Sequence, residues 1–68
     1  MFKVGDAVCI NVNMKNWSLD EIKEQFEGEL ELDKTYIVEE VDVSELPLLR
    51  LQDALQNFWY NHEWFVAS

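Results

Sequence analysis

The first apolar pattern in the chain has a period of two. Over residues 4–12 apolar and other positions alternate, with Val8, Ile10 and Val12 on one face and Ala7, Cys9 and Asn11 on the other. Alternation over this length predicts a half-buried strand whose apolar face meets a core. The pair Gly5-Asp6 is typical of a turn, so we expect the strand to begin directly after it.

A helical period follows, with clear signals at both ends. Ser18 and Glu21 have the spacing of a capping box, in which each side chain accepts a hydrogen bond from the backbone amide of the other residue. The apolar positions of one helical face are Leu19, Ile22 and Phe26. Gly28 supplies a left-handed terminator, so we predict a helix over residues 19–27.

The β pattern returns over residues 30–43. Leucine alternates with glutamate at its start, and Tyr36-Ile37-Val38 is the most strand-prone run in the chain. The alternation slips at Glu39-Glu40, which predicts a bulge or a sharp bend. We predict three further short strands, over residues 48–52, 58–60 and 65–66. One helical turn over residues 61–64 separates the last two of them.

Together these elements predict a mainly β fold in a single domain of residues 1–68. A sheet this small must close or be covered, because an open edge presents unpaired backbone groups to other chains. We therefore expect a small five-stranded barrel with one short helix inserted after the first strand.

Three segments resemble small SH3-like barrels. The run Lys3-Val4-Gly5-Asp6-Ala7-Val8 is similar to the opening of many of these barrels, where a Gly-Asp turn precedes the first strand. Leu32-Asp33-Lys34-Thr35-Tyr36-Ile37-Val38 resembles the entry to the second strand in barrel proteins of phages and prophages, and Trp59-Tyr60 followed by one turn and Phe65 is similar to their ending. The resemblance implies an SH3-like barrel of phage or bacterial source. It implies no particular function, because this barrel supports many unrelated ones.

Charge is the most unusual feature of the composition. The chain has fourteen acidic and five basic residues, a net charge of −9, and residues 20–45 contain eleven of the acids and two of the bases. Direct binding to nucleic acid needs cations that displace counterions, so we expect none here. One interpretation is that the acids only keep the chain soluble. The other is that they form a surface that binds a basic protein. For the second interpretation the candidate residues are Glu24, Glu27 and Glu31.

The aromatic residues also allow two interpretations. Several crowd the C-terminal end and one lies just before the helix, and the candidates for partner binding are Trp17, Trp59, Tyr60 and Trp64. They can complete a thin core, or they can form an exposed patch, since Trp and Tyr are enriched at interface hot spots.

No residue pattern indicates catalysis, a metal or a cofactor. His62 is the only histidine, and Val66 stands where a zinc-protease motif needs the second one. Cys9 is the only cysteine and has no activating base beside it in the sequence. Gly5 and Gly28 are the only glycines, too few for a phosphate-binding loop. We therefore expect no enzyme and no bound cofactor.

Location and function follow as expectations. With no apolar signal region at its start, no membrane-length apolar run and no possible internal disulfide, we expect a cytoplasmic protein that avoids membranes. We expect a monomer rather than an oligomer. The leading hypothesis is a non-enzymatic protein-interaction module that binds a partner through its acidic or aromatic surface. The alternative is an acidic nucleic-acid mimic that inhibits a host DNA-binding protein.

Overall fold

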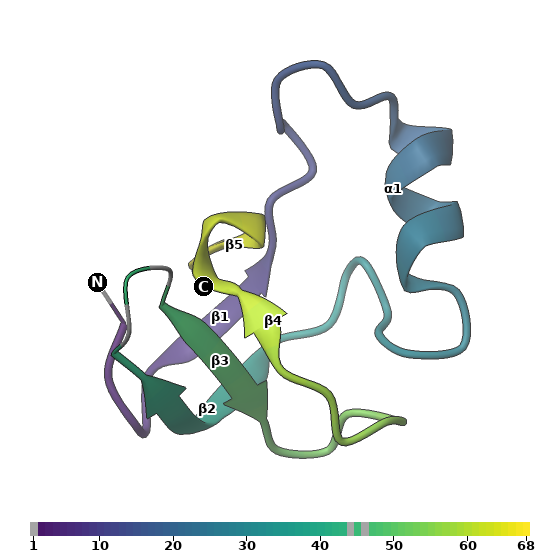
Figure 1. Cartoon of the computed structure of the whole chain (residues 1–68). Helices are drawn as coiled ribbons and strands as arrows, with labels where there is room; N and C mark the ends of the chain where they lie inside the picture. The colour runs from purple at the N-terminus through teal and green to yellow at the C-terminus, as the bar shows by residue number, and fades with distance from the viewer. Residues whose placement is uncertain (1, 44, 46) are drawn as a thin grey trace.

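The computed structural model describes residues 2–43, 45 and 47–68, and within them five antiparallel strands form one sheet with a single α-helix beside it (Figure 1). The elements in chain order are β1 (Ala7–Ile10), α1 (Leu19–Phe26), β2 (Tyr36–Asp42), β3 (Leu48–Leu51), β4 (Tyr60–Asn61), the 3-10 turn η1 (His62–Trp64) and β5 (Phe65–Ala67). The strand order is β4-β3-β2-β1-β5. The mainly β class and the single helix after the first strand are confirmed, whereas the sheet itself is not a closed ring of paired strands.

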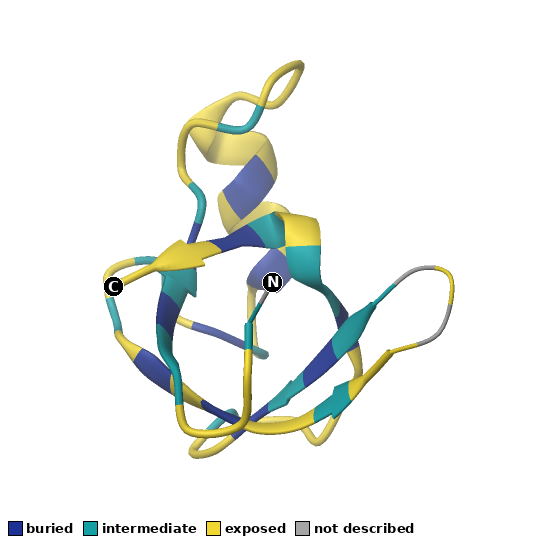
Figure 2. Cartoon of the chain, turned by 90° about the vertical axis from the view of Figure 1, so that its left-hand side faces the viewer, coloured by how far each residue is buried: buried dark blue, intermediate teal, exposed yellow. Residues whose placement is uncertain are grey.

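Strand β2 connects the two halves of the sheet. Its first residues pair with β1, where Val8 lies opposite Tyr36. Its last residues pair with β3, where Val41 lies opposite Leu49. The register shifts between Val38 and Glu40, so the predicted bulge at Glu39-Glu40 is confirmed. A bulge bends its strand, and the sheet curls accordingly in the view of Figure 2.

The core fills the concave side of this curl and the inner face of α1. The buried apolar side chains are Val8, Ile10, Ile22, Phe26, Leu30, Tyr36, Val38, Leu49, Leu51, Tyr60 and Phe65. They come from every strand and from the helix, which Figure 2 shows as buried positions distributed over all these elements. Alternation along β1 and β3 places every second residue inside, as a half-buried strand requires.

Both ends of α1 form as the sequence predicts. The Glu21 amide donates to Ser18 Oγ at 3.2 Å, and the Ser18 amide donates to Glu21 Oε1 at 3.0 Å, which completes the capping box. Two interactions with Ser18 lower the pKa of the Glu21 carboxyl from its ordinary value of 4.5. The larger is the hydrogen bond from the Ser18 backbone amide, and the smaller is the hydrogen bond with the Ser18 hydroxyl. The helix ends at Phe26, and Gly28 adopts the left-handed conformation at φ 76° that residues with a Cβ rarely take.

Two predicted strand segments are wrong in extent. Strand β1 ends at Ile10, and Val12 is 44% exposed instead of continuing the buried face. The Asn11 amide donates to the Trp64 carbonyl at 2.8 Å, after which the chain leaves the sheet toward α1 (Figure 1). Residues 30–35 are likewise not a strand, because their backbone groups bond to the helix end and to a side chain; Leu30 donates to the Phe26 carbonyl at 3.0 Å.

The C-terminal end matches the predicted order with shifted boundaries. Strand β4 covers Tyr60–Asn61 rather than residues 58–60, and η1 supplies the predicted single helical turn. Asn61 caps this turn, since its Oδ1 accepts the Glu63 amide at 2.9 Å. The described part of the chain contains no helix with the length and apolarity that crossing a bilayer requires.

We expect Ser18→Ala to lower the free energy of unfolding by about 1 kcal/mol, because it leaves the Glu21 amide at the helix start without its acceptor. In a domain of this size the melting temperature should fall by about 4–8 °C. Ser18→Asn is the matched control, because asparagine is an equally good capping residue and should keep the melting temperature within about 2 °C. An alanine variant that melts with the natural chain would contradict the structural role of this cap.

Candidate functional site

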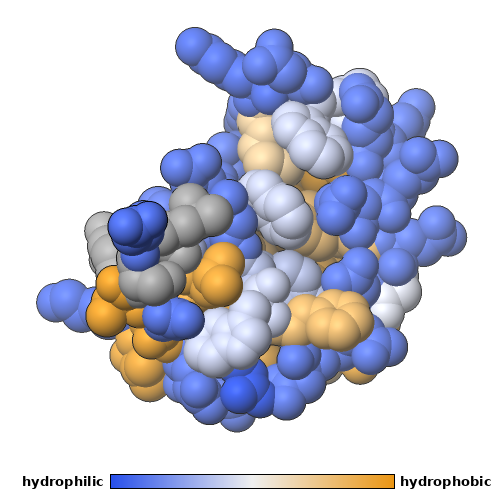
Figure 3. Space-filling view, in the orientation of Figure 1, coloured by the Kyte–Doolittle hydropathy of each residue, from blue (hydrophilic) through white to orange (hydrophobic). Residues whose placement is uncertain are grey.

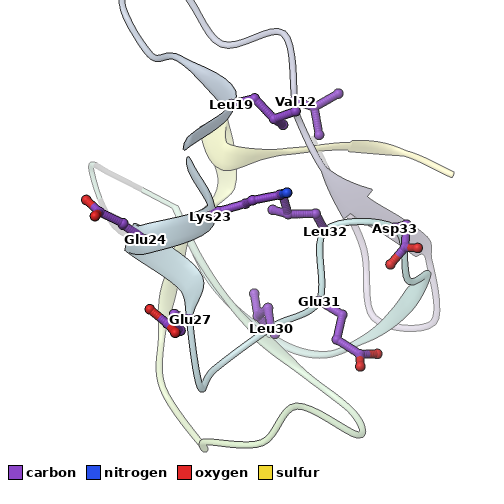
Figure 4. Close-up of a pocket in the computed structure, with 9 residues that line it drawn as sticks. All are labelled: Val12, Leu19, Lys23, Glu24, Glu27, Leu30, Glu31, Leu32 and Asp33. Atoms are coloured by element: carbon purple, nitrogen blue, oxygen red, sulfur yellow. The ribbon is translucent and has the colours of Figure 1, made fainter. Parts of the chain in front are cut away.

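A groove lies between α1 and the segment that follows it (Figure 4), with a volume of about 680 Å³. From the helix it is lined by Leu19, Lys23, Glu24 and Glu27. The other wall is formed by consecutive residues of the following segment, Leu30, Glu31, Leu32 and Asp33, and Val12 closes one end. The groove therefore brings three parts of the chain together. The strands and the helix predicted from the sequence did not indicate that these parts are neighbours.

The helix wall follows from helical spacing. Leu19, Lys23 and Glu27 are four residues apart, so they form one stripe along α1. Ile22 and Phe26 occupy the neighbouring stripe and are buried, at 0% and 1% exposed. Because that neighbouring stripe is fixed in the core, the first stripe is held at the border of the groove.

The opposite wall is fixed by backbone hydrogen bonds rather than by a strand. The amides of Glu29 and Leu30 both donate to the Phe26 carbonyl, at 2.9 and 3.0 Å. The Glu31 amide donates to Tyr36 Oη at 2.9 Å. These three bonds reverse the chain at the end of α1 and bring the segment back alongside the helix.

Side chains in this segment alternate between the inside and the outside of the groove. In Figure 4, Leu30 and Leu32 point between the two walls, while Glu31 and Asp33 point away from the helix. We call the aliphatic residues the floor of the groove: Val12, Leu19, Leu30 and Leu32. The floor is partly open to solvent, since Leu19 is 51% exposed whereas Leu30 is 6% exposed.

Carboxylates flank this floor on two sides. Glu24 and Glu27 lie on the helix side and Glu31 and Asp33 on the other (Figure 4), and we call these four residues the rim. All four are exposed. The cation among the lining residues is Lys23, which forms no ion pair with any described residue. Negative charge beside apolar walls creates a field that attracts a cationic partner.

Other acids of the same acidic stretch have structural partners instead. Glu21 completes the helix cap. Glu40 Oε1 accepts from Arg50 Nη1 at 3.3 Å, and Glu29 Oε1 accepts from Tyr60 Oη at 3.3 Å. These three carboxylates therefore have partners within the fold, whereas the four rim carboxylates face solvent around the groove.

The three acidic candidates from the sequence, Glu24, Glu27 and Glu31, all line this groove. Sequence reasoning missed the lysine, the aliphatic floor and Asp33, which completes the rim. The signals were present in the four-residue spacing of Leu19, Lys23 and Glu27 and in the alternation after Gly28. The sequence predicted a different helix face, Leu19, Ile22 and Phe26, and a strand after Gly28, without the reversal that brings the two segments together.

The aromatic candidates lie outside the groove and do not form one common patch. Trp59 is 42% exposed, and the Arg50 guanidinium lies 5.4 Å from its ring centroid. Trp17 and Trp64 border a separate, mostly polar hollow of about 360 Å³. On the face where β3 and β4 lie, Figure 3 shows pale and apolar residues interrupting the hydrophilic surface.

Tyr60 belongs to the core, at 3% exposed. Its ring centroid lies 6.2 Å from that of Phe26 and 6.0 Å from that of Phe65, in tilted and edge-on arrangements. Burial, and then the charge and the hydrogen bond of Glu29, raise the pKa of the Tyr60 phenol to about 12. A ring in this position stabilises the fold and offers little surface to a partner.

The described residues include no group of three His, Cys, Asp or Glu side chains arranged to hold a metal ion. Cys9 is a half-buried free thiol on β1, and His62 opens η1. Comparison of the chain with protein-family models, with curated proteins and with solved structures gave no match. The function proposed below therefore depends on the geometry of the chain itself.

The contact between Tyr60 and Glu29 generates a prediction at alkaline pH. Because folding raises the pKa of Tyr60 from 10 to about 12, the folded state holds this proton more tightly than the unfolded state. The resulting stability is complete below pH 10 and is lost as the pH rises from 10 to about 12. Tyr60→Phe should flatten this part of the stability curve, and ultraviolet absorbance of tyrosinate should show that the high-pKa titration has disappeared.

Glu29→Gln is the matched control for this titration. It keeps an oxygen acceptor and removes the charge, so the pKa of Tyr60 should fall only in part, since burial is the largest cause of the shift. A natural chain in which Tyr60 titrates near 10 would contradict the buried position of this residue.

Proposed function

We propose that the chain is a non-enzymatic protein-interaction module that binds a basic partner protein through the groove between α1 and residues 30–33. The observation that carries the proposal is the placement of four rim carboxylates on two sides of an aliphatic floor. This arrangement matches a protein surface that presents cations beside apolar side chains. It gathers Glu24, Glu27 and Glu31, which were candidates on charge alone, around one concave feature.

The floor and the rim would contribute differently to binding. Apolar area removed from water on the floor contributes about 25 cal/mol per Å², and it slows dissociation. The exposed rim charges attract a basic partner and speed association, an effect that salt weakens. Binding by such a groove should therefore respond to salt mainly in its association rate.

We also propose that the curled sheet is a small SH3-like barrel. Its two edge strands, β4 and β5, are consecutive in the chain and are joined by η1. The turn is tied to both sides of the sheet, because the His62 amide donates to the Pro47 carbonyl at 3.1 Å and the Trp64 carbonyl accepts the Asn11 amide at 2.8 Å. A phage or bacterial source belongs to the same proposal and rests on the resemblance of residues 3–8 and 32–38.

The alternative function is mimicry of nucleic acid, directed at a DNA-binding protein. The observation in its favour is that the rim carboxylates stand in two groups with a furrow between them, as phosphates flank a groove of DNA. The aliphatic floor favours the first proposal, since the phosphate-binding side chains of a DNA-binding protein would have no use for it. The two proposed functions predict different results when the floor residues are truncated. Binding should weaken if the groove recognises a basic protein through its floor, and it should stay unchanged if the chain mimics nucleic acid.

The test of the proposed function is the triple variant Glu24→Gln, Glu27→Gln and Glu31→Gln. Its affinity for a short synthetic peptide of leucine and lysine should fall about ten-fold, at about 0.5 kcal/mol per exposed charge pair lost. Most of the change should appear as slower association, measured by stopped-flow fluorescence at low salt. Stability should hold or rise slightly, because like charges repel one another in the folded state.

The matched control changes three exposed acids away from the groove, Glu39→Gln, Glu45→Gln and Asp53→Asn. It alters the net charge by the same amount as the first triple variant. The comparison therefore distinguishes the effect of the groove carboxylates on affinity from the effect of the overall charge of the chain. Equal weakening by both triple variants would overturn the assignment of binding to the groove. If leucine truncation of the floor, Leu19→Ala with Leu32→Ala, left the affinity unchanged, the mimicry alternative would be favoured instead.

A further inference from the structure

The side chain of Lys23 forms part of the lining of the groove. Lys23 starts from the helix wall, and in the view of Figure 4 its side chain extends toward the opposite wall, in the direction of Leu32. Lys23 thus lines the same groove as the aliphatic floor and the rim carboxylates. Lysine commonly buries its stem on apolar surface while keeping its charged end in water.

Lys23 has no partner that would hold it in this place. It forms no ion pair with any described residue, and it is itself exposed. Lys34 is placed differently, because its ammonium group lies 5.1 Å from the ring centroid of Tyr36. A side chain that covers an apolar floor without a fixed partner can be displaced by a stronger ligand.

We infer that the groove is a subsite for a partner segment in which a Lys or Arg side chain lies beside an aliphatic one, and that this segment displaces Lys23. The inference rests on the function proposed above and specifies its ligand. The partner's cation would replace the Lys23 ammonium group in the groove that the rim carboxylates flank. The partner's aliphatic side chain would cover the floor at Leu19, Leu30 and Leu32 once the Lys23 stem has moved away.

This mode of binding makes Lys23 an internal competitor. Its charge reduces the field of the rim, and its stem occupies apolar surface that the partner needs. Each contribution can be removed separately. Lys23→Met removes the charge but keeps an unbranched apolar stem of similar length, whereas Lys23→Ala removes both.

The experiment measures the affinity of three short synthetic peptides for the natural chain and for these variants. The peptides are an amphipathic leucine–lysine peptide, a serine–lysine peptide of equal charge, and a leucine–serine peptide of equal apolar content. We expect the leucine–lysine peptide to bind the natural chain at least ten-fold more tightly than either of the others. Lys23→Met should strengthen its binding about two-fold and Lys23→Ala about five-fold.

Lys3→Ala is the matched control, because it changes the net charge equally at an exposed residue outside the groove. It should leave the affinity within about two-fold of the natural value. Thermal melts of all three variants should coincide with that of the natural chain, since Lys23 and Lys3 are exposed.

The outcomes separate this inference from the proposed function. If no peptide binds any variant, the proposed function is overturned as well. If the leucine–lysine peptide binds and is weakened by the triple Gln change, but Lys23→Ala binds no more tightly than Lys23→Met, only the displacement of Lys23 is overturned. Equal binding of the serine–lysine and leucine–lysine peptides would show that the floor is not used, and would overturn the ligand assigned here.

Discussion

Phe26 connects the sheet, the helix and the groove. Its ring is 1% exposed and lies 5.3 Å from the ring of Trp64 in an edge-on contact, which fixes the last turn of α1 against the C-terminal part of the sheet. Its carbonyl accepts the amides of Glu29 and Leu30, which ends the helix and reverses the chain. One residue thus anchors one wall of the groove through its side chain and starts the other through its backbone. The shape of the groove depends on how well this residue is packed.

The elements with local causes could be predicted from the sequence. The capping box at Ser18 and Glu21 involves neighbouring residues only, and the register shift between β2 and β3 at Glu39-Glu40 is signalled by a break in the alternation of β2 itself. The residues 30–35 could not be predicted, because the alternation of leucine and glutamate that suggests a strand also suits an irregular segment with one buried side. What decides between them is a bond from the Glu31 amide to the Tyr36 hydroxyl and two bonds to a helix end.

The candidate site was predictable in its charge but not in its shape. Glu24, Glu27 and Glu31 could be selected because acids gather in one stretch of the chain. The sequence could not separate them from Glu29 and Glu40, whose partners Tyr60 and Arg50 lie far along the chain. Tyr60 shows the same limit, since nothing in the run Phe58-Trp59-Tyr60 tells which ring the fold will bury. Contacts between segments that are separated in the sequence settle both questions.

The edges of the sheet restrict how this chain can recognise another one. Strand β4 has two residues and β5 has three, so each offers few free backbone groups to an incoming strand. A partner cannot extend the sheet by adding a long strand, the mode in which the main chain supplies most of the affinity and side chains only select. The recognition of a basic protein proposed above would therefore rest on side chains. The net charge of −9 makes two copies of the chain repel each other. Because the edge strands also offer few backbone groups for pairing between copies, growth of a fibre is opposed.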